Sequence, residues 1–197
     1  MDLNLPSNNL KRWQILSVEN HAHDLDSRFS HLQATLLVNR GISSSIQVYE
    51  FLNPSVLHNP FLLPDMEKAV ERIKQAIGNN EKVGIFGDFD TDGITGTALL
   101  TKTLEQFGLV VRPYIPNRIT EGHGLSKTSI DLLHSLGVSL LITVDCGSSS
   151  TNEIQYASSL GMDVIVTDHH SIPEKMPPAL AIINHNRIDS KYPFQGL

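Results

Sequence analysis

The stretch 82-KVGIFGDFDTDG-93 joins a short apolar run to three aspartates at alternate positions. An apolar run of this length is typical of a strand buried inside a parallel sheet. Asp88, Asp90 and Asp92 follow it at once, and Gly93 comes next. Three carboxylates so close together indicate a cation site, either a calcium-binding loop or a catalytic metal site, and the rest of the chain has to distinguish the two.

The alternation of strands and helices continues from residue 66 to the end of the chain. Apolar residues at helical spacing predict helices over residues 66–78, 97–108, 126–137 and 151–161. Short apolar runs predict strands over residues 82–86, 109–115, 139–144, 163–167 and 179–183. Ser126 is a predicted N-cap, and Gly78, Gly108 and Gly137 are predicted helix ends. This order predicts an α/β fold, with a mostly parallel sheet and helices on both faces.

The first part of the chain follows a different pattern. Residues 32–42 predict a short helix that ends at Gly41, and the proline-rich residues 51–64 predict a connector of turns and short helices. We therefore expect an N-terminal appendage over residues 1–65 and a separate α/β domain over residues 66–197.

Composition restricts the class of protein. The 197 residues carry a net charge of -6, which argues against a broad basic face for nucleic acid but does not exclude an enzyme that acts on it. The sequence contains no apolar run long enough to span a bilayer, and its N-terminus does not resemble a signal peptide. Cys146 is the single cysteine, which excludes an internal disulfide and fits a reducing cytosol.

Acidic residues and histidines follow three of the predicted strands at the same end. Residues 82–86 lead into Asp88, Asp90 and Asp92, residues 139–144 into Asp145, and residues 163–167 into Asp168, His169 and His170. Parallel strands would gather these side chains along one edge of the sheet. Carboxylates that close repel one another unless cations neutralise them, and oxygen ligands with a few imidazoles suit Mn²⁺ or Mg²⁺. Two such ions would activate a water and hold a phosphate oxygen.

Simpler interpretations fit each segment taken alone. The first aspartates match positions 1, 3 and 5 of an EF-hand loop, but position 12, which should be glutamate, is Leu99. An aspartate pair after a strand is often a turn, and TDHH (167–170) alone fits a helix cap with surface histidines. Because the acidic residues of three independent segments all follow the carboxyl ends of predicted strands, we favour a shared metal site.

The three segments also resemble a known family. DFDTDG (88–93), VDCG (144–147) and VTDHH (166–170) resemble motifs I, II and III of the DHH phosphoesterase superfamily. YIPNRITEGHGLS (114–126), the segment INHNRIDSKYPFQGL (183–197) and the N-terminal RGI…FLNP are similar to the RecJ family, bacterial exonucleases that degrade single-stranded DNA from the 5′ end.

The resemblance implies a role for each site residue. It implies that the first motif supplies metal ligands, with Asp88 in support, that Asp145 bridges two ions and that His169 is a further ligand. His170 is implied beside the scissile phosphate as a catalytic residue, oriented by Asp168, while Arg118 and His123 are implied to bind substrate. The metal ligands implied are Asp88, Asp90, Asp92, Asp145 and His169.

Four departures from the family pattern limit the resemblance. His123 stands where tyrosine is usual, His185 where proline is usual, and Phe86 where some members place a metal-binding histidine. No aspartate lies beyond Asp189, so the fourth motif and the domain that closes over the strand are missing. We therefore expect an N-terminal piece of a longer enzyme, with an incomplete two-metal site and weak or no activity of its own.

The resemblance implies a metal-dependent 5′-3′ exonuclease of single-stranded DNA in repair and recombination. It also implies a cytoplasmic monomer without membrane association, with helicases or single-strand-binding proteins as partners. Two alternatives stay open: a phosphodiesterase of small substrates such as oligoribonucleotides or cyclic dinucleotides, and a catalytically dead homologue that serves as a scaffold.

Overall fold

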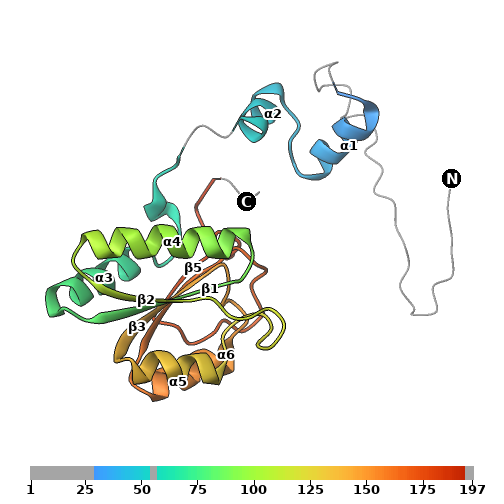
Figure 1. The fold of residues 1–197 in the computed structure, drawn as a ribbon. Helices are drawn as coiled ribbons and strands as arrows, with labels where there is room; N and C mark the ends of the chain where they lie inside the picture. The colour runs from blue at the N-terminus through green and yellow to red at the C-terminus, as the bar shows by residue number, and fades with distance from the viewer. Residues whose placement is uncertain (1–28, 54–56, 194–197) are drawn as a thin grey trace. The chain divides into compact units, whose positions relative to one another are not determined.

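The computed structural model describes residues 29–53 and 57–193, and the chain divides into two compact units, Met1–Leu57 and His58–Leu197. Figure 1 shows the helices and strands of both units. The division falls earlier in the chain than the boundary predicted at residue 65. Much of the predicted appendage, namely residues 1–28 and 54–56, and the last residues of the family-like C-terminal segment lie outside the described residues.

Two short helices make up the described part of the first unit. Helix α1 spans His31–Asn39 and helix α2 spans Ser45–Leu52, and each begins with a capping box in which a serine and a glutamine three residues later satisfy each other's backbone N–H groups. Ala34, Leu37 and Val48 form a small apolar cluster between them. The predicted helix with Gly41 after its end is confirmed, whereas α2 was not predicted, since only its last two residues fall within the predicted connector, residues 51–64.

A five-stranded, wholly parallel sheet forms the centre of the second unit, as predicted (Figure 1). Its strand order is β2-β1-β3-β4-β5. Each strand coincides with one of the apolar runs, because both faces of these strands are covered. The strands are β1 Lys82–Gly87, β2 Val110–Tyr114, β3 Val138–Val144, β4 Asp163–Thr167 and β5 Ala181–Ile183.

Helices cover both faces of this sheet. Helices α3 (Met66–Asn79) and α4 (Thr91–Gln106) pack on one face, where Ala76 and Leu104 join a cluster with the inward residues of β1 and β3. Helices α5 (Lys127–Ser135) and α6 (Thr151–Ser159) pack on the opposite face, where Ile130 and Ile154 are fully buried (Figure 1). A short 3-10 helix, η1, spans Pro60–Leu62 and precedes α3.

Two predicted helix boundaries are wrong. Gly78 lies inside α3, which runs to Asn79, and Asn80 caps it because this residue adopts a left-handed conformation with φ 53° and its N–H bonds the Ala76 and Ile77 carbonyls. Helix α4 begins at Thr91 and not at Thr97, because the Asp90 carboxylate accepts a hydrogen bond from the Gly93 N–H and caps the helix. The predicted N-cap at Ser126 is confirmed.

The direction of the strand order changes between β1 and β3, and this point is where a ligand site is expected. Strand β1 connects outward through α4 to β2, and β3 continues in the other direction to β4 and β5. Ligands of doubly wound sheets bind at this switch point, outside the carboxyl ends of the two strands. Over the ranges that the structure describes, no helix combines the length and the apolar composition needed to cross a membrane.

Candidate metal centre

The three acidic loops begin at neighbouring points on the carboxyl edge of the sheet. Asp88, Asp145 and Asp168 each donate a backbone N–H that extends the parallel ladder by one bond beyond the strands. The acceptors are the carbonyls of Val144 (3.1 Å), Thr167 (2.9 Å) and Ile183 (3.1 Å), respectively. The predicted convergence therefore follows directly from strand register, because the first residue after β1, β3 and β4 is an aspartate in each case.

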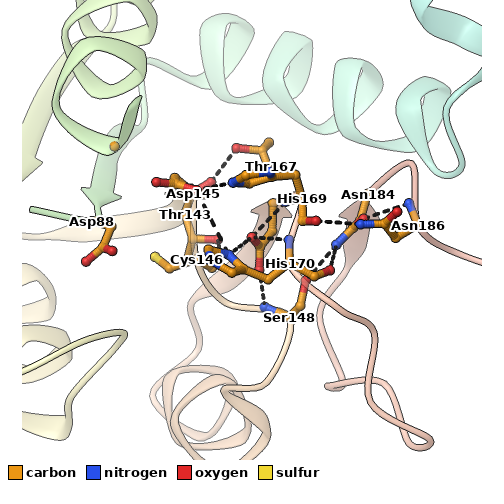
Figure 2. A network of polar contacts seen from close by, with 12 residues as sticks. Asp88, Thr143, Asp145, Cys146, Ser148, Thr167, His169, His170, Asn184 and Asn186 are labelled. Atoms are coloured by element: carbon orange, nitrogen blue, oxygen red, sulfur yellow. Dashed lines mark hydrogen bonds and ion pairs between the residues drawn. The ribbon is translucent and has the colours of Figure 1, made fainter. Parts of the chain in front are cut away.

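Asp145 lies at the centre of the cluster, directly after β3 (Figure 2). Its backbone is left-handed, with φ 60°, a conformation that aspartate tolerates better than most residues. The turn that follows is held by Thr143, whose Oγ1 donates to the Cys146 carbonyl over 2.7 Å. This turn leaves the Asp145 side chain only 6% exposed and 2.9 Å from His169 Nε2, measured at Oδ1.

Two groups of ligand atoms share Asp145. In one group, Asp88, Asp90 and Asp145 each offer an oxygen, and these atoms lie within 4.8 Å of one another. In the other group, Asp145 is joined by His169 and His170 under the same distance limit. A carboxylate common to two such groups is the arrangement that two neighbouring cations need.

Buried oxygens without hydrogen bonds test whether a cation fits this site. For the part of the chain that the structure describes, Asp88 Oδ1 and both carboxylate oxygens of Asp145 are buried and accept no hydrogen bond. His169 Nε2 approaches Asp145 but is not aligned as a donor. Buried carboxylate oxygens normally have partners, because burying them without partners is costly. Divalent cations supply the missing interaction, so the residues present fit a metal site.

The charges of the cluster shift the protonation of its members. Burial, followed by the nearby Asp90 and Asp92 carboxylates, raises the pKa of Asp145 to about 6. The hydrogen bond from the Gly93 backbone lowers the pKa of Asp90, so this carboxylate is the more readily ionised of the pair. In the metal-free chain, Asp145 therefore carries a charge near neutral pH that the surrounding protein destabilises.

Asp168 fixes the backbone of the loop that follows β4, residues 168–170, which we call the histidine loop. Its side chain is 2% exposed, and Oδ1 accepts the backbone N–H groups of His169 (2.7 Å) and His170 (3.1 Å). The same oxygen lies 2.7 Å from His170 Nδ1, while Oδ2 accepts the Ser148 N–H over 2.9 Å. Burial alone would raise the pKa of Asp168, but these hydrogen bonds outweigh it and lower the pKa. Because a carboxylate can only accept, Nδ1 of His170 must carry the proton of this contact.

An aromatic and cationic group lies beside the acidic cluster. The Arg118 guanidinium lies over the Phe89 ring, 5.2 Å from its centroid, and the His123 ring centroid lies 4.3 Å from that of Phe89. His123 Nδ1 is also 3.4 Å from Asp88 Oδ2. Glu121 orders the loop that carries both residues, because it accepts hydrogen bonds from Tyr114 Oη (2.5 Å) and from a backbone N–H of the same loop.

The predicted site residues therefore differ in how closely they gather. The structure brings together, within the two ligand groups, Asp88, Asp90, Asp145, His169 and His170. Asp92 lies outside both groups, 3.7 Å from His169 Nε2, and is exposed. Asp168 supports the histidines, His123 borders the cluster, and Arg118 lies over the Phe89 ring.

The residues that depart from the family pattern are accounted for by their surroundings. Phe86 is fully buried and stacks on Tyr114 at a centroid distance of 5.5 Å, so it belongs to the core. Asp189 pairs with Arg187 at 2.8 Å, and among the described residues it makes no contact with the acidic cluster. His185 is 5% exposed, and burial followed by the charge of His169 lowers its pKa.

Several residues of the site received no role from the sequence. Phe89 lies in the first motif without a predicted role, yet its ring contacts both Arg118 and His123. Ser148, Asn184 and Asn186 form a network around the histidine loop (Figure 2). The signal available in the sequence was weak: two asparagines directly after a predicted strand, in a segment already similar to the family.

Comparison with known proteins agrees with this geometry. Residues 82–191 match the model described as the DHH family, N-terminal domain. The chain is 39% identical over 168 residues to the single-stranded-DNA-specific exonuclease RecJ of Bacillus subtilis, covering 84% of this chain and 21% of that protein. It is 37% identical over 175 residues to RecJ of Escherichia coli, covering 88% of this chain and 30% of that protein.

A solved structure is similar over most of the chain. RecJ from Thermus thermophilus in complex with Mn²⁺ superposes with a TM-score of 0.60 at 27% identity, covering 90% of this chain and 25% of that chain. The chain thus spans less than a third of the length of each of these relatives.

Proposed function

This chain belongs to the DHH family, and from that membership we propose that its acidic site binds Mn²⁺ or Mg²⁺ and hydrolyses phosphodiester bonds of single-stranded DNA from the 5′ end, in repair and recombination. The observation that carries the proposal is the pair of ligand groups that share Asp145, whose carboxylate oxygens are buried and accept no hydrogen bond among the described residues. The names of the similar proteins, single-stranded-DNA-specific exonucleases, support the choice of substrate.

Each ligand group has a distinct composition. Asp88, Asp90 and Asp145 offer oxygens alone, whereas the other group adds two imidazoles to the shared carboxylate. Oxygen-rich sites with imidazoles and no thiolate favour Mn²⁺ or Mg²⁺ over a structural zinc. Cations bound there would supply an activated water and neutralise charge on the phosphate.

The contact of His170 with Asp168 supports a proposed role in proton transfer to the substrate. The hydrogen bond to Asp168 raises the pKa of His170, so the imidazole is more often protonated near neutral pH. Asp168 occupies Nδ1, which leaves Nε2 as the atom available to a phosphate or a leaving oxygen. We assign His170 the role of stabilising or protonating the leaving oxygen, and Asp168 the role of fixing its orientation.

Arg118, Phe89 and His123 form the proposed contact with the DNA strand. A guanidinium can hold a backbone phosphate through two hydrogen bonds, and Arg118 is exposed and pre-oriented over the Phe89 ring. His123 has 73% of its side chain exposed beside the same ring, which gives a surface on which a base can stack. This contact reads backbone and base faces, so little sequence preference is expected.

A cleavage assay tests the proposal. The purified protein is incubated with Mn²⁺ and with end-labelled DNA: a 5′-phosphorylated single strand, the matching duplex and a dinucleotide. Because the chain spans less than a third of the length of its relatives, we expect only slow release of nucleotides from the 5′ end of the single strand, with loss of this activity in EDTA and in Asp145→Ala. Asp189→Asn is the matched control, because Asp189 pairs with Arg187 outside the cluster, and it should retain activity.

The other outcomes identify the alternatives. Cleavage of the dinucleotide alone would favour a phosphodiesterase of small substrates, and Mn²⁺ binding without any cleavage would refute the proposed activity. Helicase or single-strand-binding protein partners, the monomeric state and the cytoplasmic location stay predictions from the resemblance.

A further inference from the structure

Asn184, the first residue after β5, connects two of the acidic loops. It is 1% exposed, and its side-chain N–H groups donate to Ser148 Oγ (3.0 Å) and to the His170 carbonyl (2.9 Å). Its side-chain oxygen accepts the Asn186 N–H over 2.9 Å. Ser148 lies in the loop after β3 that begins with Asp145, so one carboxamide joins the loop of the shared carboxylate to the loop of the histidines (Figure 2).

Asn186 holds the neighbouring residue of the same loop. Its Nδ2 donates to the His169 carbonyl over 2.5 Å, so the two asparagines together hold the backbone carbonyls of both histidines. Asp168 accepts the backbone N–H groups of the same two residues. The backbone of the histidine pair is therefore fixed on its donor side and on its acceptor side by three side chains.

The segment that carries the asparagines is itself fixed. Arg187 Nη1 donates to Asp65 Oδ2 (2.6 Å) and to the Ile182 carbonyl (2.7 Å). Asp65 also accepts the Ile182 N–H over 3.0 Å. These bonds tie both ends of the Asn184–Asn186 segment to β5 and to the start of α3, so the asparagines are presented from a rigid support.

The histidine loop needs such support because no regular element contains it. Residues 168–170 follow β4 without helix or strand geometry. The two imidazoles nevertheless lie 4.9 Å apart between ring centroids and offer nitrogens within 4.8 Å of Asp145. Removing a residue that orients a metal ligand commonly lowers metal affinity by about 10- to 100-fold.

We propose that Asn184 and Asn186 are positioning residues of the metal site, which hold the backbone of His169 and His170 at the distance from Asp145 that a shared cation requires. This proposal rests on the proposed metal-binding function. It assigns no contact with substrate or cation to either asparagine: both act through the histidine backbone.

Mn²⁺ titration of matched variants tests the proposal. Isothermal titration with Mn²⁺ is carried out on the wild-type protein, Asn184→Ala and Asn186→Ala. We expect Mn²⁺ affinity to fall by about 10- to 100-fold in Asn184→Ala, with a smaller loss in Asn186→Ala, which keeps the link to Ser148. Asn186 is exposed, so its variant is expected to fold and decides the question if Asn184→Ala does not.

Two controls separate positioning from loss of stability. Asn79→Ala removes an exposed asparagine that donates one hydrogen bond, to Glu81 Oε1 (3.2 Å), near the opposite edge of the sheet. Leu104→Ala destabilises the core at the C-terminal end of α4, far along the helix from Asp90. Both controls should keep the wild-type Mn²⁺ affinity, although Leu104→Ala is expected to be the less stable protein.

A second readout follows the histidines without metal. In the metal-free protein, the imidazole C–H resonances of His169 and His170 should shift or broaden in Asn184→Ala, while those of the exposed His134 stay unchanged. No Mn²⁺ binding by the wild-type protein would refute the metal site itself. If the wild-type protein binds Mn²⁺ and both asparagine variants bind it with the same affinity as Asn79→Ala, the positioning role is overturned while the metal site stands.

Discussion

Replacing Asp145 by asparagine should stabilise the protein without metal and remove its stabilisation by metal. Asparagine has almost the same shape as aspartate and tolerates the left-handed backbone at this position, so the turn after β3 is kept. The substitution removes one buried charge from the centre of a carboxylate cluster. The sign of its effect therefore depends on whether cations are present.

The magnitude follows from the protonation of the cluster. Burial and the neighbouring carboxylates raise the pKa of Asp145 from 3.8 to about 6. Each tenfold change in proton affinity corresponds to about 1.4 kcal/mol, so at pH 7 the ionised Asp145 lowers the stability of the metal-free fold by about 3 kcal/mol. The buried carboxamide keeps part of this cost because it lacks partners, and the expected net gain for Asp145→Asn is about 2 kcal/mol.

Thermal unfolding in EDTA and in Mn²⁺ measures both effects. In EDTA at pH 7, we expect Asp145→Asn to melt about 4–8 °C above the wild type. With Mn²⁺ at about 100 times its dissociation constant, the wild type should gain about 2.7 kcal/mol and the variant little, so the order of stability reverses. Because the folded-state pKa lies above the unfolded value, metal-free wild type should also gain stability as pH falls from 7 towards 4, and the variant should lose part of that gain.

Asp189→Asn is the control for this comparison. Asp189 pairs with Arg187, which lowers its pKa, so its replacement should not stabilise the protein in EDTA and should leave the response to Mn²⁺ intact. If Asp145→Asn is no more stable than the wild type in EDTA, or if it gains as much stability from Mn²⁺, the Asp145 charge does not destabilise the metal-free fold as proposed.

Three further perturbations test other parts of the structure. Arg72 lowers the pKa of Glu81 to about 2, so this pair stabilises the fold above pH 4.5 and loses its effect as pH falls towards 2. In urea unfolding, Glu81→Gln should cost about 2 kcal/mol at pH 7 and less than half of that at pH 3. An equal cost at both pH values would contradict the pairing. Arg118→Lys keeps the charge but loses the guanidinium that lies over the Phe89 ring, so single-stranded DNA should bind about fivefold more weakly in fluorescence anisotropy with the same salt dependence. Unchanged affinity would argue against the contact. A Cβ at Gly93 would lie 2.3 Å from a backbone oxygen of the loop after β1, so Gly93→Ala should cost about 3 kcal/mol in urea unfolding. A Cβ at Gly78 would meet nothing within 4 Å, so Gly78→Ala should stabilise α3 by about 0.5–1 kcal/mol. Similar effects of the two substitutions would show that the close approach at Gly93 is absent.

The sheet and the meeting of the acidic loops could be predicted from the sequence because both follow from local pattern. Buried parallel strands appear as short apolar runs, and parallel strands place whatever follows them at one edge. The start of α4 could not be placed by the same means. Asp90 was interpreted only as a ligand, but its carboxylate also caps the helix, and apolar periodicity is weak in that first turn.

The supporting contacts of the site could not be predicted because they join residues far apart in the chain. Asn184 bonds Ser148, which lies 36 positions away, through a side chain that follows no periodic pattern. The contact of Arg118 with the Phe89 ring depends likewise on how one loop folds over another. In both cases the residue type was visible in the sequence, but its partner was set by tertiary structure.

Anomalous diffraction from crystals grown with Mn²⁺ tests the central claim most directly, namely that separate acidic loops share paired cations through Asp145. The structure predicts two manganese peaks on either side of the Asp145 carboxylate, about 3.5–4 Å apart, one beside Asp88 and Asp90 and the other beside His169 and His170. Manganese bound elsewhere, or a map with no peak at this edge of the sheet, would contradict it.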